Sequence, residues 1–134
     1  MKNVLILCTG NSCRSIMGEA LINAKLGDCV FAQSSGVKAS GKVNPHAQAL
    51  LKAKGYWKDV YHSKIIDTVI DTAFDLVVTV CDHAHETCPM FPKATKTIHV
   101  SFEDPSGKEV EAYAKTLALI EETLLPIIQS ELCD

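Results

Sequence analysis

The chain has 134 residues, of which 47% are hydrophobic and 22% charged, and its formal net charge is −3. This size and composition predict one globular domain spanning residues 1–134. The slightly acidic charge, with no long basic run, argues against nucleic acid or an anionic membrane as the main partner. The chain shows no stretch of roughly 20 apolar residues and no signal peptide. We therefore expect a cytoplasmic monomer.

The first third of the chain alternates between strand and helix patterns. Residues 4–8 form a continuous apolar run, which is typical of a strand buried on both faces. Apolar side chains at helical spacing predict a helix over about 14–26. Residues 30–34 then read as a second strand.

The middle of the chain is predicted to be mainly helical. Pro45 suits the first turn of a second helix, and we expect Ala49, Leu50 and Ala53 on its buried face. Residues 65–73 predict another short helix.

The last part of the chain returns to strands and ends in a helix. We expect strands over 75–81 and 97–102, and an amphipathic helix from Val110 that Pro126 kinks or ends. Strands alternating with helices predict an α/β fold, with a parallel sheet and helices on both faces. Ligands of such sheets bind beyond the carboxyl ends of the strands, where Cys8 and Cys81 lie.

Six cysteines are present, but the chain is large enough to build a core and shows no export signal, so we do not expect a disulfide framework. Cytosolic thiols are normally reduced, so these side chains are candidates for catalytic, redox or metal-binding roles. Cys29 and Cys133 stand apart from any polar cluster, and we expect both to be free thiols that pack as small hydrophobic groups. The six are Cys8, Cys13, Cys29, Cys81, Cys88 and Cys133.

The stretch CTGNSCRS, residues 8–15, connects the first strand to the first helix. Its backbone N–H groups and those of the helix start predict an anion cradle, in which Gly10 allows a tight turn. Arg14 adds a planar fork that suits a tetrahedral oxyanion. A helix N-terminus and a guanidinium also predict a lowered pKa for Cys8. The predicted oxyanion-binding residues are Thr9, Gly10, Asn11, Ser12, Cys13, Arg14 and Ser15.

Residues 81–88, CDHAHETC, allow three interpretations. Two cysteines and two histidines could bind zinc, although their spacing matches no common zinc motif. The segment could instead be a helix with incidental cysteines. In the third interpretation Cys81 and Cys88 form a redox pair. A helix would separate their Cα atoms by roughly 10.5 Å, whereas a disulfide needs about 4.4–6.8 Å, so a helix must unwind before the pair oxidises. Pro89 and Pro92 would limit how far such a helix could resist unwinding.

The loop resembles the phosphate-binding loop of the low-molecular-weight protein tyrosine phosphatase superfamily. Within it the chain is similar to the thioredoxin-coupled arsenate reductases, through Val77–Cys81, the pair Cys81 and Cys88, and Phe102–Pro105. The resemblance implies a four-stranded parallel sheet of order 2-1-3-4.

The resemblance also implies a mechanism without cofactor or metal. Arsenate, with phosphate or sulfate as mimics, would bind in the loop. Cys8 would be the nucleophile and Asp104 the general acid, with Glu103 as a second choice. Cys81 and Cys88 would relay the disulfide to a thioredoxin-type reductant. Ser106 and Gly107 follow Asp104 in place of the tyrosines that often hold phosphotyrosine.

Two other functions stay open at this stage. A phosphatase acting on phosphotyrosine or another phosphomonoester would need Cys8, Arg14 and Asp104, but neither Cys81 nor Cys88. A non-catalytic redox or metal sensor would need only residues 81–88.

One departure from the family pattern concerns a potassium site beside the loop. Some of these reductases hold the ion with ligands that match Asn11, Glu19 and Ser34, but Lys64 follows Ser63 where those reductases have an aspartate. We hypothesise that the Lys64 ammonium replaces the cation, pairing with Glu19 and donating to Asn11. Alternatively, Lys64 is a solvated lysine and the ion site is simply lost.

Overall fold

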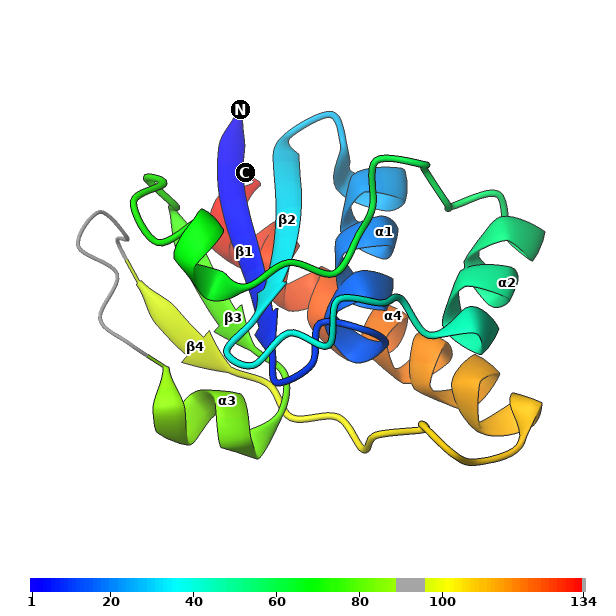
Figure 1. Ribbon diagram of the computed structural model, residues 1–134. Helices are drawn as coiled ribbons and strands as arrows, with labels where there is room; N and C mark the ends of the chain where they lie inside the picture. The colour runs from blue at the N-terminus through cyan, green and yellow to red at the C-terminus, as the bar shows by residue number, and fades with distance from the viewer. Residues whose placement is uncertain (89–95, 134) are drawn as a thin grey trace.

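A parallel sheet organises the molecule (Figure 1). The computed structural model describes residues 1–88 and 96–133; Pro89 and Pro92 lie outside them. Strand order is β2-β1-β3-β4 with parallel pairing throughout, which confirms the predicted fold class and strand order. The elements in chain order are β1 (Lys2–Cys8), α1 (Arg14–Leu26), β2 (Val30–Gly36), α2 (Pro45–Ala53), the 3₁₀ helix η1 (Ile66–Thr68), β3 (Leu76–Thr79), α3 (Asp82–Thr87), β4 (Thr97–His99) and α4 (Val110–Leu132).

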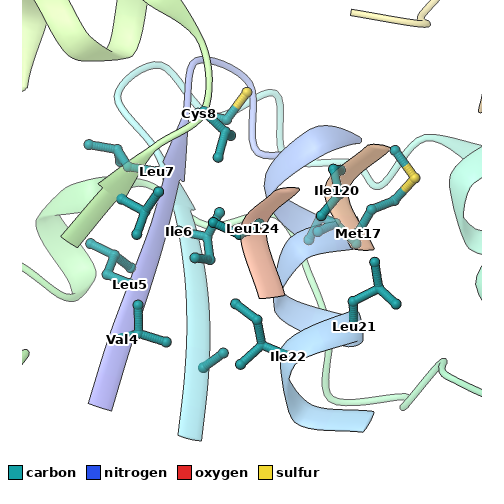
Figure 2. Packing of buried hydrophobic residues seen from close by; sticks show 14 of the residues in the cluster. Val4, Leu5, Ile6, Leu7, Cys8, Met17, Leu21, Ile22, Ile120 and Leu124 are labelled. Atoms are coloured by element: carbon teal, nitrogen blue, oxygen red, sulfur yellow. The ribbon is translucent and has the colours of Figure 1, made fainter. Parts of the chain in front are cut away.

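Strand β1 forms the centre of the core. Five consecutive residues, Val4 to Cys8, are buried, because both faces of the sheet are covered. In Figure 2, Ile6 lies on the side of Leu124, whereas Leu5 and Leu7 point to the other side. Gly18 of α1 lets the layers approach closely, since a Cβ there would lie 3.3 Å from Ile6 and 3.5 Å from Leu124.

Helices α1 and α4 pack against each other on one side of the sheet, and α2 lies beside them (Figure 1). The predicted helix over 65–73 is wrong except for the single turn of η1. That segment instead pairs with the sheet through a bridge between Gly36 and Ile65, which holds the chain extended before the turn. It buries Ile66 and Val69 against the core.

Helix α2 presents a different face from the predicted one. Ala47 and Leu51 are buried, and Ala49 and Ala53 are exposed. The start of the helix sets this orientation, because the Asn44 side chain caps it and donates to the Tyr113 hydroxyl at 3.1 Å.

Helix α4 continues past Pro126 to Leu132, so of the two expected outcomes, a kink or an end at the proline, the second is wrong. Pro126 cannot donate to the carbonyl of Glu122, but both residues are exposed, and water can satisfy that carbonyl. Leu124 and Ile128, on either side of the proline, are fully buried and hold the helix against the core.

The prediction that Cys29 and Cys133 are free is wrong. The two form a disulfide with their Cα atoms 6.0 Å apart. Cys29 directly precedes β2, and Lys2 of β1 donates to its carbonyl. The bond therefore ties the end of α4 to the amino-terminal end of the sheet, opposite the 8–15 loop (Figure 1). Sequence separation hides this proximity, which arises only when α4 packs across the sheet. No helix within the described ranges is long and apolar enough to cross a membrane.

Candidate active site

The 8–15 loop is held from outside through its carbonyl groups. The carbonyls of Cys8, Thr9, Gly10 and Ser12 accept hydrogen bonds of 2.8–3.0 Å from backbone N–H groups of residues 37–44. The N–H groups of residues 10–13 donate to no protein acceptor among the described residues. With its carbonyls engaged outward, the loop retains a run of unpaired N–H donors, as an anion cradle requires.

Asn11, and not Gly10, supplies the left-handed turn of this loop. Its φ is 49°, and its side chain is fully buried. The side-chain amide donates to the hydroxyls of Ser15 at 2.8 Å and Ser34 at 2.9 Å, and its oxygen accepts from the Lys64 backbone N–H at 2.7 Å. These three bonds stabilise a backbone conformation that asparagine tolerates better than most residues.

Gly36 is a structural residue of the site that sequence reasoning missed. A Cβ at this position would lie 2.6 Å from the carbonyl oxygen of Thr9 and 3.0 Å from the backbone nitrogen of Asn11. Any side chain would therefore push the loop off the end of β2. The sequence signal was a glycine at the carboxyl end of a strand, where a close backbone approach is common.

Glu19 and Ser34 lie beneath the loop and connect to it through Asn11. The Ser34 hydroxyl donates to Glu19 Oε1 at 2.6 Å. Burial raises the pKa of Glu19 to about 7, although the Ser34 hydroxyl and the positive charge of Lys64 act in the opposite direction. Lys64 makes no ion pair with Glu19 within 4.0 Å in the described part of the chain, and its bond to Asn11 comes from its backbone. The cation role of its ammonium stays a prediction.

Arg14 and Asp104 meet at the mouth of the loop. One Arg14 nitrogen, Nη1, donates to the Phe102 carbonyl at 3.1 Å, and Nη2 lies 3.5 Å from Asp104 Oδ2. The buried Nε of Arg14 has no hydrogen-bond partner among the described residues. Partial burial opposes ionisation of Asp104, but hydrogen bonds from Ser106 and the charge of Arg14 outweigh it and lower its pKa. Asp104 is thus ionised in this state.

Cys8 and Cys81 come together at the carboxyl ends of β1 and β3, as predicted. The two thiols hydrogen-bond to each other, and the Thr9 hydroxyl lies 3.1 Å from Cys81 Sγ. The hydrogen bond to Cys81, together with burial, raises the pKa of Cys8, which is opposite to the predicted direction. The hydrogen bond from Cys8 lowers the pKa of Cys81 to about 5. The shared hydrogen bond therefore favours a thiolate on Cys81 and a protonated thiol on Cys8.

Cys13 and Cys88 differ in their surroundings. Burial, reinforced by the nearby Asp104 carboxylate, raises the pKa of Cys13 to about 12, so this thiol stays protonated and is a poor nucleophile. Cys88 is half-buried directly after α3, and burial raises its pKa as well.

Helix α3 separates Cys81 from Cys88. Cys81 is its N-cap and Cys88 its C-cap, both with extended backbone, and residues 82–87 between them are helical in this state. Within residues 1–88 and 96–133, no three Cys, His, Asp or Glu side chains converge as a metal site would need. A disulfide between Cys81 and Cys88 requires α3 to unwind, because the helical rise exceeds the Cα separation that a disulfide allows.

Comparison with known proteins identifies the family. Residues 3–131 match the family described as low molecular weight phosphotyrosine protein phosphatase. The chain belongs to this family.

Among its relatives, an arsenate reductase of Brevibacillus brevis is 43% identical over 108 residues, covering 81% of this chain and 80% of the relative. The crystal structure of an arsenate reductase from Archaeoglobus fulgidus is 34% identical, with a TM-score of 0.79 over 93% of this chain and 98% of that one. A YwlE arginine phosphatase from Geobacillus stearothermophilus is 28% identical, with a TM-score of 0.75 over 98% and 95%.

Proposed function

We propose that this protein reduces arsenate to arsenite through a relay of three cysteines, Cys8, Cys81 and Cys88, and that a thioredoxin-type dithiol regenerates it. The observation that carries the proposal is the hydrogen-bonded pair of Cys8 and Cys81, with Cys88 at the other end of α3. A phosphatase needs only the Cys8 thiol. Several relatives more than 40% identical are named arsenate reductases, which supports the same conclusion.

Substrate binding rests on donors that the protein itself does not use. The unpaired N–H groups of residues 10–13 and the Arg14 Nε–H suit the oxygens of a tetrahedral dianion. Arsenate fits this description, and phosphate or sulfate would bind as mimics. An oxyanion beside Asp104 would also raise the pKa of that carboxyl by charge repulsion, which favours the protonated form that a general acid needs.

The first chemical step is attack by Cys8 on arsenic. The Cys8 proton moves to Cys81, to which it is already hydrogen-bonded, and leaves a thiolate under the loop. An S–As bond forms and an As–O bond breaks. Asp104 protonates the departing oxygen, a contribution of roughly 10²–10⁴ in rate.

The second step reduces the metalloid. Cys81 gives its proton to an oxygen of the bound arsenic group and attacks Cys8 Sγ. An S–S bond forms, and the electron pair of the S–As bond stays on arsenic, which leaves as arsenite. Cys88 then attacks Cys81, so that the Cys81–Cys88 disulfide forms and Cys8 departs as a thiolate. A thioredoxin-type dithiol reduces that disulfide by exchange.

The experiment that tests the proposal follows arsenate-dependent oxidation of thioredoxin beside hydrolysis of p-nitrophenyl phosphate. Cys8→Ser should abolish both activities. Cys81→Ala should stop reduction and leave phosphate ester hydrolysis largely intact. Cys88→Ala should release one equivalent of arsenite and stall as a Cys8–Cys81 disulfide, visible by peptide mass. Parental arsenate reduction by both the Cys81 and Cys88 variants would refute the relay.

A further inference from the structure

A histidine outside the active-site loop connects three elements around α3. His99, the last residue of β4, places Nε2 3.0 Å from Oδ1 of Asp82, the first residue of α3. Its Nδ1 lies 2.7 Å from the hydroxyl of Thr79, the last residue of β3. The ring also stacks on His85 of α3, with centroids 4.3 Å apart and an interplanar angle of 26°. His99 therefore touches the short helix at two positions, three residues apart.

The ionisation of Asp82 determines which atom donates in its hydrogen bond with His99. The hydrogen bond from His99 is the largest of the contacts that lower the pKa of Asp82, so the carboxylate is ionised and can only accept. His99 Nε2 must then carry the proton and donate it to Asp82. Thr79 is fully buried in the central part of the sheet, so its hydroxyl holds the ring from a rigid position. The donor that reaches α3 is oriented by the sheet itself.

The position of these contacts matters because α3 has to open. Asp82 and His85 lie in the first turn of the helix, directly after Cys81, and the His85 N–H closes that turn on the Cys81 carbonyl at 3.1 Å. Any unwinding that lets Cys88 approach Cys81 must break the turn that His99 holds. The whole of α3 is six residues long, so it offers few further backbone hydrogen bonds to hold it wound.

We propose that His99 is a positioning residue that, through Asp82 and His85, keeps α3 wound and so limits the rate at which Cys88 reaches Cys81. This inference rests on the proposed relay. The affected step is the exchange in which the Cys88 thiolate attacks a disulfide at Cys81, forms the Cys81–Cys88 bond and displaces the other sulfur as a thiolate. With the helix wound, the Cys8–Cys81 bond can form before Cys88 competes for Cys81.

Two variants test the contact from both sides. His99→Phe keeps a ring that can stack on His85 but removes the donor to Asp82. Asp82→Ala removes the acceptor, and its position is exposed, so folding of the domain does not depend on it. Glu131→Gln is the matched control, because it breaks the exposed ion pair of 2.9 Å with Lys96, near the opposite end of β4.

The first measurement is hydrogen exchange at the backbone amides of α3 in the reduced protein. Removing a hydrogen bond with one exposed partner should speed exchange at His85 about two- to fivefold in both variants, and not in the Glu131 control. Combining the two changes should add little to either alone, since both remove the same bond. Parental exchange in both variants would overturn the proposal.

The second measurement is the rate of Cys81–Cys88 disulfide formation with oxidised glutathione, in a Cys8→Ser background that isolates the pair. Glutathione disulfide reacts with Cys81, and Cys88 then displaces glutathione. This displacement should accelerate by the same factor as amide exchange. If the parent forms the disulfide and both variants do so at its rate, the proposal for His99 fails while the relay stands. If no chain forms it, the relay itself fails.

Discussion

Replacing Glu19 with glutamine should remove a large part of the pH dependence of stability. Glu19 is 4% exposed, and burial raises its pKa to about 7 from the ordinary value of 4.5. Between these two values the folded protein keeps a proton that the unfolded chain has released. The folded state then binds more protons, so the free energy of unfolding falls as pH rises.

The size of this effect follows from the pKa difference. Each pH unit between the two values is worth about 1.4 kcal/mol, so the ionisation of Glu19 costs about 3 kcal/mol of stability between pH 4.5 and pH 7. Glutamine keeps an oxygen that can accept from Ser34 but carries no charge at any pH. Any effect of the amide on packing is the same at every pH. The pH dependence of the difference in unfolding free energy therefore still reports the ionisation of Glu19.

The assay is urea unfolding of both chains between pH 4.5 and pH 8. The stability of Glu19→Gln relative to the parent should rise by about 3 kcal/mol across this range, with the change complete just above pH 7. Glu122→Gln, at an exposed position on α4, provides the control for a change of net charge. A difference between Glu19→Gln and the parent that stays flat, or that falls as pH rises, would refute the reasoning.

The remaining predictions concern the supporting lysine, the acid and the disulfide. If Lys64 replaces a cation beside Glu19, Lys64→Ala should lower the melting temperature, and exchanging potassium for sodium at fixed ionic strength should leave the parent unchanged; a potassium-specific rise would contradict this. Asp104→Asn should slow the first turnover of arsenate by roughly 10²–10⁴ in rapid quench, and a parental rate would exclude it as the acid. Reducing the Cys29–Cys133 bond, which closes a separation of 104 residues, should cost up to about 4.7 kcal/mol of stability by calorimetry. Cys133→Ser should show the same loss without reductant, and equal stability of all forms would disprove the effect.

Contacts between strand ends were predictable from the sequence. The apolar run before Cys8 and the one before Cys81 each indicate a buried strand, and parallel strands bring their carboxyl ends to one edge. That reasoning placed the two thiols together correctly. It failed on the pKa of Cys8, because it considered the helix and Arg14 but not the second thiol, whose hydrogen bond raises that pKa more strongly than Arg14 lowers it.

Features that depend on packing across the chain were not predictable. The disulfide joins residues 104 apart, and only the course of α4 across the sheet brings them together. The close approach at Gly36 depends on where the loop crosses β2. The contact of His99 with Asp82 joins a strand end to a helix start, and the sequence gives no spacing rule for such a pair.

The bond between Cys29 and Cys133 has a consequence for cleavage of the chain. Because it joins Cys29 to Cys133, residues 29–133 form a covalent ring. A protease that cuts one peptide bond inside this ring opens it without separating the fragments. Such a nicked protein would run as one species on a gel without reductant and as two with it. Limited digestion under the two conditions therefore distinguishes chains that carry the bond from chains that do not, with no need for mass spectrometry.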